Sequence, residues 1–381
     1  MDAMRWFTLG AAGCTALAWL ALRRPTALLL IVLATFAVGP QWVFGASASP
    51  TLLAWAIPAQ MLLLLAALLI NVVHYGLRLD ATNWPLVAVL WLLCQSLLLA
   101  DLDPAITTAA LVVGALSFAL PWCLMHVALQ PGSRMRYAVL IALLPMLCVL
   151  AGAILQLLGL HPLFSGSEER GVRLQGATNS AWLAFLAFIG FAVAMHEAVR
   201  RRRVDFAGLA ALNLGIALLS GGRMSLVACG ILATSYVLLA RGVRLRVALL
   251  ALIVLAGAGG LLAFAPHVPL QELVADPARL LDPNGRDWIW RGYLDEFLAS
   301  PLFGRGLGAA EHSSYQELPH NAYLRLLVDG GVIGAAVYGL AVVLWARRVL
   351  GLVRRSERPF VWAMFLALGA YAFTDNVLIM P

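Results

Sequence analysis

The stretch Y-A-V-L-I-A-L-L-P-M-L-C-V-L-A-G-A-I-L-Q-L-L-G-L, residues 137–160, contains no charged side chain. A helix needs about 20 predominantly apolar residues to cross the roughly 30 Å hydrocarbon core of a bilayer. This stretch is long enough to do so. It therefore predicts a membrane-spanning helix, and similar stretches lie on both sides of it in the chain.

Apolar runs of this kind extend along the whole chain and indicate the fold class. We expect an all-α polytopic membrane protein with about twelve transmembrane helices, because the 62% hydrophobic content of the 381 residues suffices for about a dozen spans. The first run is interpreted as a retained span rather than a signal peptide, since Arg23 and Arg24 follow it. The runs lie near residues 4–21, 26–44, 51–73, 85–99, 106–128, 137–160, 180–199, 206–221, 223–240, 247–265, 321–346 and 359–379.

The overall composition excludes several other classes of protein. Charged residues make up only 12% of the chain and the mean hydropathy is +0.89, which excludes a soluble globular domain, a disordered chain and a disulfide scaffold. The net charge of +7 comes from arginine, because the sequence contains no lysine. Chemistry that needs a lysine, such as a Schiff base, is therefore excluded. The cysteines fall inside apolar runs and are expected to act as small hydrophobic residues.

Arginine clusters orient the predicted helices, because cytoplasmic loops of membrane proteins carry an excess of basic residues. All the clusters fit one alternating topology. In that topology the segments near 161–179 and 266–319, the turn at 220–223 and both chain ends face the periplasm. The clusters are Arg23-Arg24, Arg134 with Arg136, Arg200–Arg203, Arg241–Arg246 and Arg347–Arg355.

This topology divides the chain into four parts. Residues 1–160 form N-terminal transmembrane helices, 161–265 form central helices with an arginine turn, 266–319 form a large periplasmic loop, and 320–381 form C-terminal helices. The large loop is expected to contain an amphipathic helix over about 285–299, ended by Ser300-Pro301. Residues 304–308, with three glycines, are expected to form a flexible turn. The apolar face of the predicted helix would consist of Trp288, Ile289, Tyr293, Leu294 and Phe297.

Three arginines at the predicted periplasmic face are candidate anion ligands. Arg223 lies in the tight turn L-S-G-G-R-M-S-L, on the side where basic residues are scarce, although an interfacial arginine could also reach water from there. Arg286 opens the predicted loop helix, where a helix N-terminus and a guanidinium together suit a phosphate. Arg291 points to a different face of that helix and fits a solvated surface better.

Further candidates lie at the starts of two other predicted helices. His320 follows the large loop and could take a proton from a hydroxyl, with Asn321 beside it, or both could form a polar helix cap. Arg173 and Gln175 precede a helix that starts near Asn179, and could hold sugar or phosphate oxygens or form an ordinary interfacial loop. The sequence has no group of residues with metal-ligand spacing, so we expect no metal and no other cofactor.

At these residues the chain resembles the O-antigen ligase family, part of a superfamily of ligases and polymerases. The best match is H-N, nine residues and then G-x-x-G, supplied by His320, Asn321, Gly331 and Gly334. The stretch G-R-D-W-I-W-R-G-Y-L-D-E-F-L-A-S-P-L-F-G-R-G-L-G resembles the segment that precedes this motif. R-L-Q-G-A-T-N-S and S-G-G-R-M-S look like two earlier signatures, so the resemblance runs from about residue 170 to 335.

The resemblance implies a glycosyltransferase of the bacterial inner membrane, with a GT-C-like architecture. It would move a polysaccharide from undecaprenyl pyrophosphate to the lipid A core oligosaccharide, without a metal and with inversion. By motif position, His320 would be the catalytic base, and Arg223 and Arg286 would bind the pyrophosphate. Arg173, Gln175, Asn179, Arg291 and Asn321 are further candidates for substrate binding.

Other functions fit parts of the same pattern. An O-antigen polymerase or a protein O-oligosaccharyltransferase would use the same donor, and these motifs do not distinguish the acceptors. A lipid or polysaccharide transporter should carry charges near the bilayer midplane and repeated halves. The sequence favours the transferase, because its distinctive charges lie at one membrane face. The expected partners are membrane lipid, the lipid-linked donor and the acceptor, and no nucleic acid.

Overall fold

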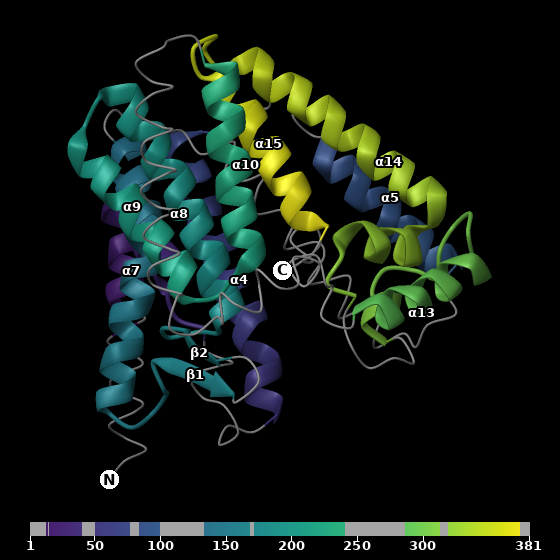
Figure 1. The fold of residues 1–381 in the computed structure, drawn as a ribbon, viewed down its shortest axis with the longest axis horizontal. Coiled ribbons are helices and arrows are strands. Elements are labelled where there is room, and N and C mark those ends of the chain that lie inside the picture. Colours follow the sequence, from purple (N-terminus) through teal and green to yellow (C-terminus); the bar gives the residue numbers. More distant parts are fainter. Residues whose placement is uncertain are drawn as a thin grey trace, which may run out of the picture.

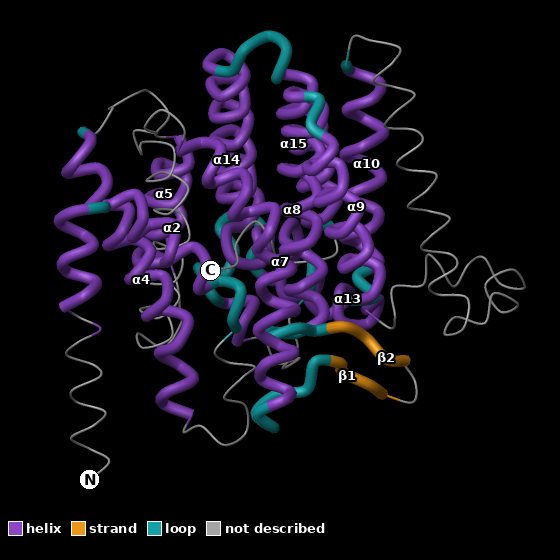
Figure 2. The backbone as a smooth tube through the Cα atoms, turned by 90° about the vertical axis from the view of Figure 1, so that its left-hand side faces the viewer, coloured by secondary structure: helices purple, strands orange, loops and turns teal. Residues whose placement is uncertain are grey.

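The computed structural model describes residues 15–39, 50–76, 84–99, 133–167, 171–240, 286–312 and 319–373, together with Gly13. These parts of the chain are mostly helical (Figures 1 and 2). Several predictions lie outside the described residues. They concern the helices near 106–128 and 247–265, the arginines between 241 and 246, the first part of the large loop and the two chain ends.

The helices follow the predicted apolar runs. Among the described residues, three helices are long and apolar enough to cross a membrane, and shorter apolar helices accompany them. This confirms a helical membrane protein, while the number of about twelve crossings stays a prediction. The three are α7 (Ser133–Leu157, apolar from Arg134), α8 (Ser180–Arg201) and α14 (Ala322–Leu352). The others are α2 (Pro25–Thr35), α4 (Pro50–Tyr75), α5 (Trp84–Leu99), α9 (Val204–Leu219), α10 (Arg223–Leu239), α13 (Arg286–Ala299), the 3₁₀ helix η3 (Ala309–His312) and α15 (Arg358–Ala372).

Two expectations about the fold are wrong in detail. The run near 26–44 does not stay helical, because the chain leaves α2 after Thr35 and the Gly39 N–H donates to the Ala177 carbonyl at 2.9 Å. The fold is also not purely α, since the 161–179 segment contains a two-stranded antiparallel hairpin of β1 (Phe164–Ser167) and β2 (Gly171–Leu174). Backbone N–H and C=O groups outside a helix need other partners, and in this short segment they pair within the hairpin.

A central bundle of helices forms the largest core. The buried side chains of α8, among them Phe188, Phe191 and Met195, pack against α9, α10 and α15. On the far side of α15, α14 lies beside α5 (Figure 1). An N-terminal helix thus packs directly against the helix that follows His320.

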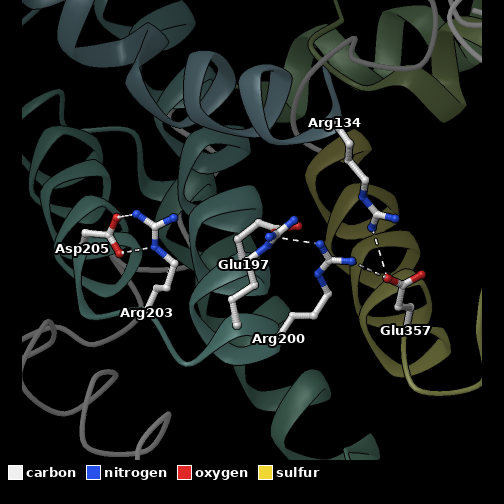
Figure 3. Close-up of polar contacts among 7 residues, drawn as sticks. Arg134, Glu197, Arg200, Arg203, Asp205 and Glu357 are labelled. Carbon is white, nitrogen blue, oxygen red and sulfur yellow. Dashed lines mark hydrogen bonds and ion pairs between the residues drawn. The ribbon is translucent and has the colours of Figure 1, made fainter. Parts of the chain in front are cut away.

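Three of the arginine clusters lie at one end of the bundle. Arg134 of α7 and Arg200 of α8 both pair with Glu357, at 3.1 and 3.2 Å, just before α15 begins (Figure 3). Glu197 pairs with Arg200 and with Arg201. Three clusters that are distant in sequence therefore share one end of the helices. Which side of the membrane this end faces stays a prediction.

Replacing Glu357 with glutamine is expected to destabilise the protein by about 1–3 kcal/mol, because two guanidiniums lose a largely buried charged partner. Burial raises the pKa of the Glu357 carboxyl, but Arg134 and Arg200 more than offset this, so its pKa lies below the usual value. The stabilising contribution is therefore present above the usual glutamate pKa and is lost as the pH falls through the lowered one. Thermal unfolding in detergent at pH 7 and at decreasing pH tests this. A melting temperature of Glu357→Gln equal to that of wild type at pH 7 would contradict it.

Candidate functional site

His320 stands directly before α14 in a constrained backbone conformation. Asn321 caps the helix, because its Oδ1 accepts hydrogen bonds from the N–H groups of Tyr323 and Leu324, both at 3.1 Å. His320 itself has a φ of 45°, and among the described non-glycine residues only Arg202 also has a positive φ. Such a conformation persists where the surrounding structure fixes it, and it is typical of functional positions. The half-buried His320 side chain is therefore held at a defined place.

The predicted amphipathic helix of the large loop is confirmed as α13, and it packs on the start of α14. The Trp290 indole N–H donates to the Pro319 carbonyl at 2.8 Å, one turn after Arg286 and one residue before His320. Ile289 and Tyr293 are buried against α14. The first turn of α13 and the histidine are therefore neighbours.

The predicted apolar face of α13 is only partly correct. Ile289 and Tyr293 are buried and Phe297 is partly buried, but Trp288 and Leu294 are 53% and 46% exposed. Among the described residues, the buried stripe packs against α14 and η3. The helix ends where predicted, since the Ser300 N–H closes the last turn on the Phe297 carbonyl at 3.0 Å.

The C-terminal end of α15 links the starts of three helices. The hydroxyl of Tyr371 lies 3.2 Å from that of Ser225, in the first turn of α10. The Phe373 ring packs edge-on against Trp290 of α13, with 5.7 Å between the centroids. Tyr323, in the first turn of α14, donates to the Gly369 carbonyl at 2.8 Å. The first turns of α10, α13 and α14 therefore surround the same end of α15.

These three helices begin at the three residues proposed for catalysis. Arg223 is the first residue of α10, Arg286 is the first residue of α13, and His320 immediately precedes α14 with its cap. Arg223 is exposed and forms no ion pair with the carboxylates that the structure describes. The N-cap of α10 is Gly222, which provides no side-chain cap for the first N–H groups of the helix. The arrangement suits an anion near a histidine.

The segment between the hairpin and α8 supplies one further arginine. Arg173 on β2 packs over Gly221, in the turn before Arg223, where an added Cβ would lie 3.1 Å from its Nε. Gln175 is buried and donates to the Pro162 carbonyl at 2.7 Å, and Asn179 caps α8 by accepting from the Trp182 N–H at 2.6 Å. Arg173 thus lies close to the Arg223 turn, while Gln175 and Asn179 have structural partners. Arg291 is exposed on α13.

The G-x-x-G part of the motif breaks α14. Gly331 has a φ of 62° and a ψ of −169°, a combination that is essentially restricted to glycine. A Cβ at this position would lie 2.4 Å from the backbone of Leu302. Gly334 lies against Leu92 and Gln95 of α5. The two glycines of the motif therefore allow a helix break and a close helix contact.

Replacing Gly331 with alanine is expected to destabilise the protein by about 2–4 kcal/mol or to prevent folding, because the backbone conformation and the close contact both exclude a side chain. Gly339→Ala is the matched control in the same helix, since no atom lies within 4 Å of its added Cβ. The control is expected to fold with unchanged or slightly raised stability. Size-exclusion chromatography and thermal unfolding compare the two variants. Equal behaviour would contradict this description of the break.

The loop 301–306 closes on the break and is not the flexible turn that the glycines suggested. In an unbroken helix the N–H groups of Val332 and Ile333 would bond within α14. Here the Val332 N–H donates to the Pro301 carbonyl at 2.9 Å. The Ile333 N–H donates to the Leu302 carbonyl at 3.1 Å.

The carbonyls on the other side of the break are also satisfied by this loop. The Arg305 N–H donates to the Val328 carbonyl at 2.8 Å, and the Gly306 N–H donates to the Asp329 carbonyl at 3.0 Å. Gly304, Gly306 and Gly308 all have positive φ, which allows the loop to turn sharply against α14. The glycines therefore serve a packed, hydrogen-bonded loop.

Four polar residues near the break were not identified from the sequence. Arg325 and Asp329 lie four residues apart in an apolar helix, and both are nearly fully buried. Their spacing inside a membrane segment was a usable signal. Gln95 and Ser96 of α5 are also buried, but nothing in an isolated apolar run connects them with residues more than 200 positions away.

A comparison with known protein families bears on this arrangement. The model of the family described as O-antigen ligase matches residues 208–339, about a third of the chain. These residues form an O-antigen ligase domain. The domain includes the starts of α10, α13 and α14, whereas the Arg173 segment and α5 lie outside it. Neither a curated protein nor a solved structure matches the chain.

The match supports an assignment of this region to the O-antigen ligase family, within a superfamily of ligases and polymerases. Arg223, Arg286, His320 and Asn321 all lie inside the domain, as do Arg291 and the glycines of the break. The residues of the motif therefore belong to the region that the family shares.

Proposed function

We propose that this protein transfers O-antigen polysaccharide from undecaprenyl pyrophosphate to the lipid A core oligosaccharide, at the periplasmic face of the bacterial inner membrane. The observation that carries this proposal is the convergence of α10, α13 and α14 at the end of α15, each opening at one residue of the proposed catalytic set. The O-antigen ligase domain spans all three openings. The proposal assigns Arg223 and Arg286 to the donor and His320 to the acceptor.

The arginines would make the pyrophosphate a better leaving group. A guanidinium can bind two phosphate oxygens at once, and it keeps its charge at every physiological pH. As the bond between the anomeric carbon and the phosphate oxygen breaks, its electron pair passes to that oxygen. Positive charges that are already in place stabilise the negative charge that develops there. Arg173, beside the Arg223 turn, would add to this field.

His320 would activate the acceptor. The acceptor hydroxyl oxygen attacks the anomeric carbon from the face opposite the pyrophosphate, which inverts the configuration. The imidazole takes the hydroxyl proton as the new carbon–oxygen bond forms, a contribution typically worth about 10²–10⁴-fold in rate. Asn321 would support this role by fixing the helix that starts beside the histidine.

The direct test is a transfer assay with purified protein, a defined lipid-linked donor and two acceptors, lipid A core oligosaccharide and a protein. We expect product on the lipid A core and none on the protein. Extension of the donor chain itself would identify a polymerase, and product on the protein would identify an O-oligosaccharyltransferase. Movement of the donor across vesicles without product would identify a transporter.

Transfer is expected to be unaffected by excess EDTA, because arginines can supply the positive charge that a metal provides in other transferases. The measurement is the transfer rate in EDTA and after readdition of magnesium or manganese. An intact rate in EDTA agrees with the proposal. Loss of activity that either metal restores would overturn the arginine-only mechanism.

A further inference from the structure

We propose that Gln95 of α5 is a positioning residue for His320. The inference rests on the proposed function, in which His320 is the base, and it extends that function to a helix outside the O-antigen ligase domain. Gln95 acts on the break in α14, ten residues after His320 in the chain. Its effect on catalysis would pass through the first segment of that helix.

The break separates residues 322–330 from the rest of α14. This first segment has lost its helical bonds to Val332 and Ile333, whose N–H groups donate to the loop instead. The segment is two and a half turns long, and His320 lies at its N-terminal end, which contacts α13 and α15. Its direction, and with it the place of the imidazole, also depends on what holds the carbonyls at its other end.

Gln95 holds the last of these carbonyls and the loop at the same time. Its side-chain nitrogen donates to the Gly330 carbonyl at 2.9 Å and also to the Phe303 carbonyl. Its side-chain oxygen accepts from the Trp91 indole N–H at 2.9 Å. The residue is only 6% exposed, and each polar group of its amide has a partner. The amide therefore binds the last carbonyl before the break and the loop at once.

Ser96 fixes the same loop to α5 by a second route. Its hydroxyl oxygen accepts from the Leu307 N–H at 2.7 Å, and the hydroxyl donates to the Leu92 carbonyl at 2.6 Å. Leu92 itself lies against Gly330 and Gly334 on either side of the break. One turn of α5 thus contacts both the loop and the broken helix.

The loop is in turn bound to the first segment of α14 and to α13. The Ala310 N–H donates to Asp329 Oδ1 at 3.0 Å, and the Ala310 carbonyl accepts from the Tyr293 hydroxyl at 2.6 Å. Asp329 Oδ2 also lies 3.7 Å from Arg325 Nε, in the same segment. Helix α13, the loop and residues 322–330 therefore form one unit that is attached to α5 through Gln95 and Ser96.

Loss of the Gln95 amide would leave the buried Gly330 carbonyl, the Phe303 carbonyl and the Trp91 indole without this partner, so the unit should shift or loosen on α5. A displacement of about 1 Å at a reacting group can lower a rate by about 100-fold. We therefore expect Gln95→Leu to lower kcat about 10- to 100-fold, with the KM for the donor changed less than about 2-fold.

The matched control is Asn71→Leu in α4. Asn71 is fully buried, and its side-chain nitrogen also donates to two carbonyls, those of Pro25 and Ala67 at 2.9 and 2.8 Å. Both substitutions remove a buried amide of similar size from an N-terminal helix. The control should lower thermal stability and leave kcat within about 2-fold of wild type, because Asn71 does not touch the break.

Two measurements distinguish positioning from a general loss of structure. Hydrogen exchange should accelerate at residues 302–307 and 330–334 in Gln95→Leu and stay unchanged there in Asn71→Leu. His320→Ala should lower kcat by a factor about 10- to 100-fold smaller in the Gln95→Leu background than in the Asn71→Leu background, because part of the contribution of the base is already lost. If Gln95→Leu does not fold, Ser96→Ala serves as the second variant, because it removes the hydrogen bond to Leu307. It should change hydrogen exchange and the His320→Ala effect in the same direction, but less strongly.

The outcomes separate this inference from the proposed function. Unchanged hydrogen exchange in the folded variants, or a full effect of His320→Ala in the Gln95→Leu background, overturns the positioning role alone. Full transfer by His320→Ala in the otherwise wild-type protein overturns the role of the histidine and the inference with it. Loosened exchange together with the reduced His320→Ala effect supports the inference.

Discussion

Replacing His320 with alanine is expected to lower the transfer rate about 10²–10⁴-fold while leaving folding and donor binding intact. Without the imidazole, the acceptor hydroxyl would have to attack with its proton still attached. The start of α14 should be preserved, because His320 lies outside the helix, which Asn321 caps independently. The measurement is kcat with lipid-linked donor and lipid A core acceptor, together with thermal unfolding.

His161→Ala is the matched control for this prediction. His161 is also half-buried, lies on the same predicted side of the membrane and makes a 3.3 Å contact with the Thr178 carbonyl. It is expected to keep a transfer rate within about 3-fold of wild type, since surface substitutions away from special features have small effects. If a folded His320→Ala protein turns over as fast as wild type, His320 is not the catalytic base.

Helices that carry their own start and stop signals were predictable from the sequence. The spacing of apolar residues and Ser300-Pro301 gave α13 within about one residue of its actual ends. Asn179 before an apolar run marked the start of α8, and Asn321 marked the start of α14. The apolar run near 26–44 predicted a longer helix than α2, because the chain after α2 follows a contact of Gly39 with a residue more than 100 positions away.

The residues at the helix starts were predictable, but the contacts that bring them together were not. Arg223, Arg286 and His320 stand out because charged or titratable groups beside apolar runs are unusual. The helices that they open are linked at the end of α15 through Tyr371 and Phe373, two aromatic residues that look like ordinary members of a membrane helix. Gln95 is equally inconspicuous, since its partners are backbone carbonyls, which every residue supplies.

The three glycines near the break suggested a flexible turn, whereas the structure has a packed, hydrogen-bonded loop there. Gly304, Gly306 and Gly308 suggested flexibility, because glycine permits many conformations. In the folded chain the same freedom allows three positive φ angles and a close approach to Gly331. The deciding factor is the hydrogen bonding of the broken helix, which a pattern of residue types does not reveal.

Lysine at position 223 or 286 is expected to lower kcat/KM for the donor about 10- to 10³-fold, although the charge is retained. A guanidinium presents a planar fork that can bind two oxygens of a pyrophosphate, whereas an ammonium acts as a point charge. Both positions open helices, so the fork and the first N–H groups of the helix would act on the same anion.

Binding of the lipid-linked donor and the transfer rate should be measured for Arg223→Lys, Arg286→Lys and Arg136→Lys. Arg136 is an exposed arginine of α7 in the basic cluster at the other end of the bundle, and its lysine variant should match wild type. Donor affinity and rate equal to wild type in both Arg223→Lys and Arg286→Lys would assign these arginines to the membrane surface rather than to the pyrophosphate.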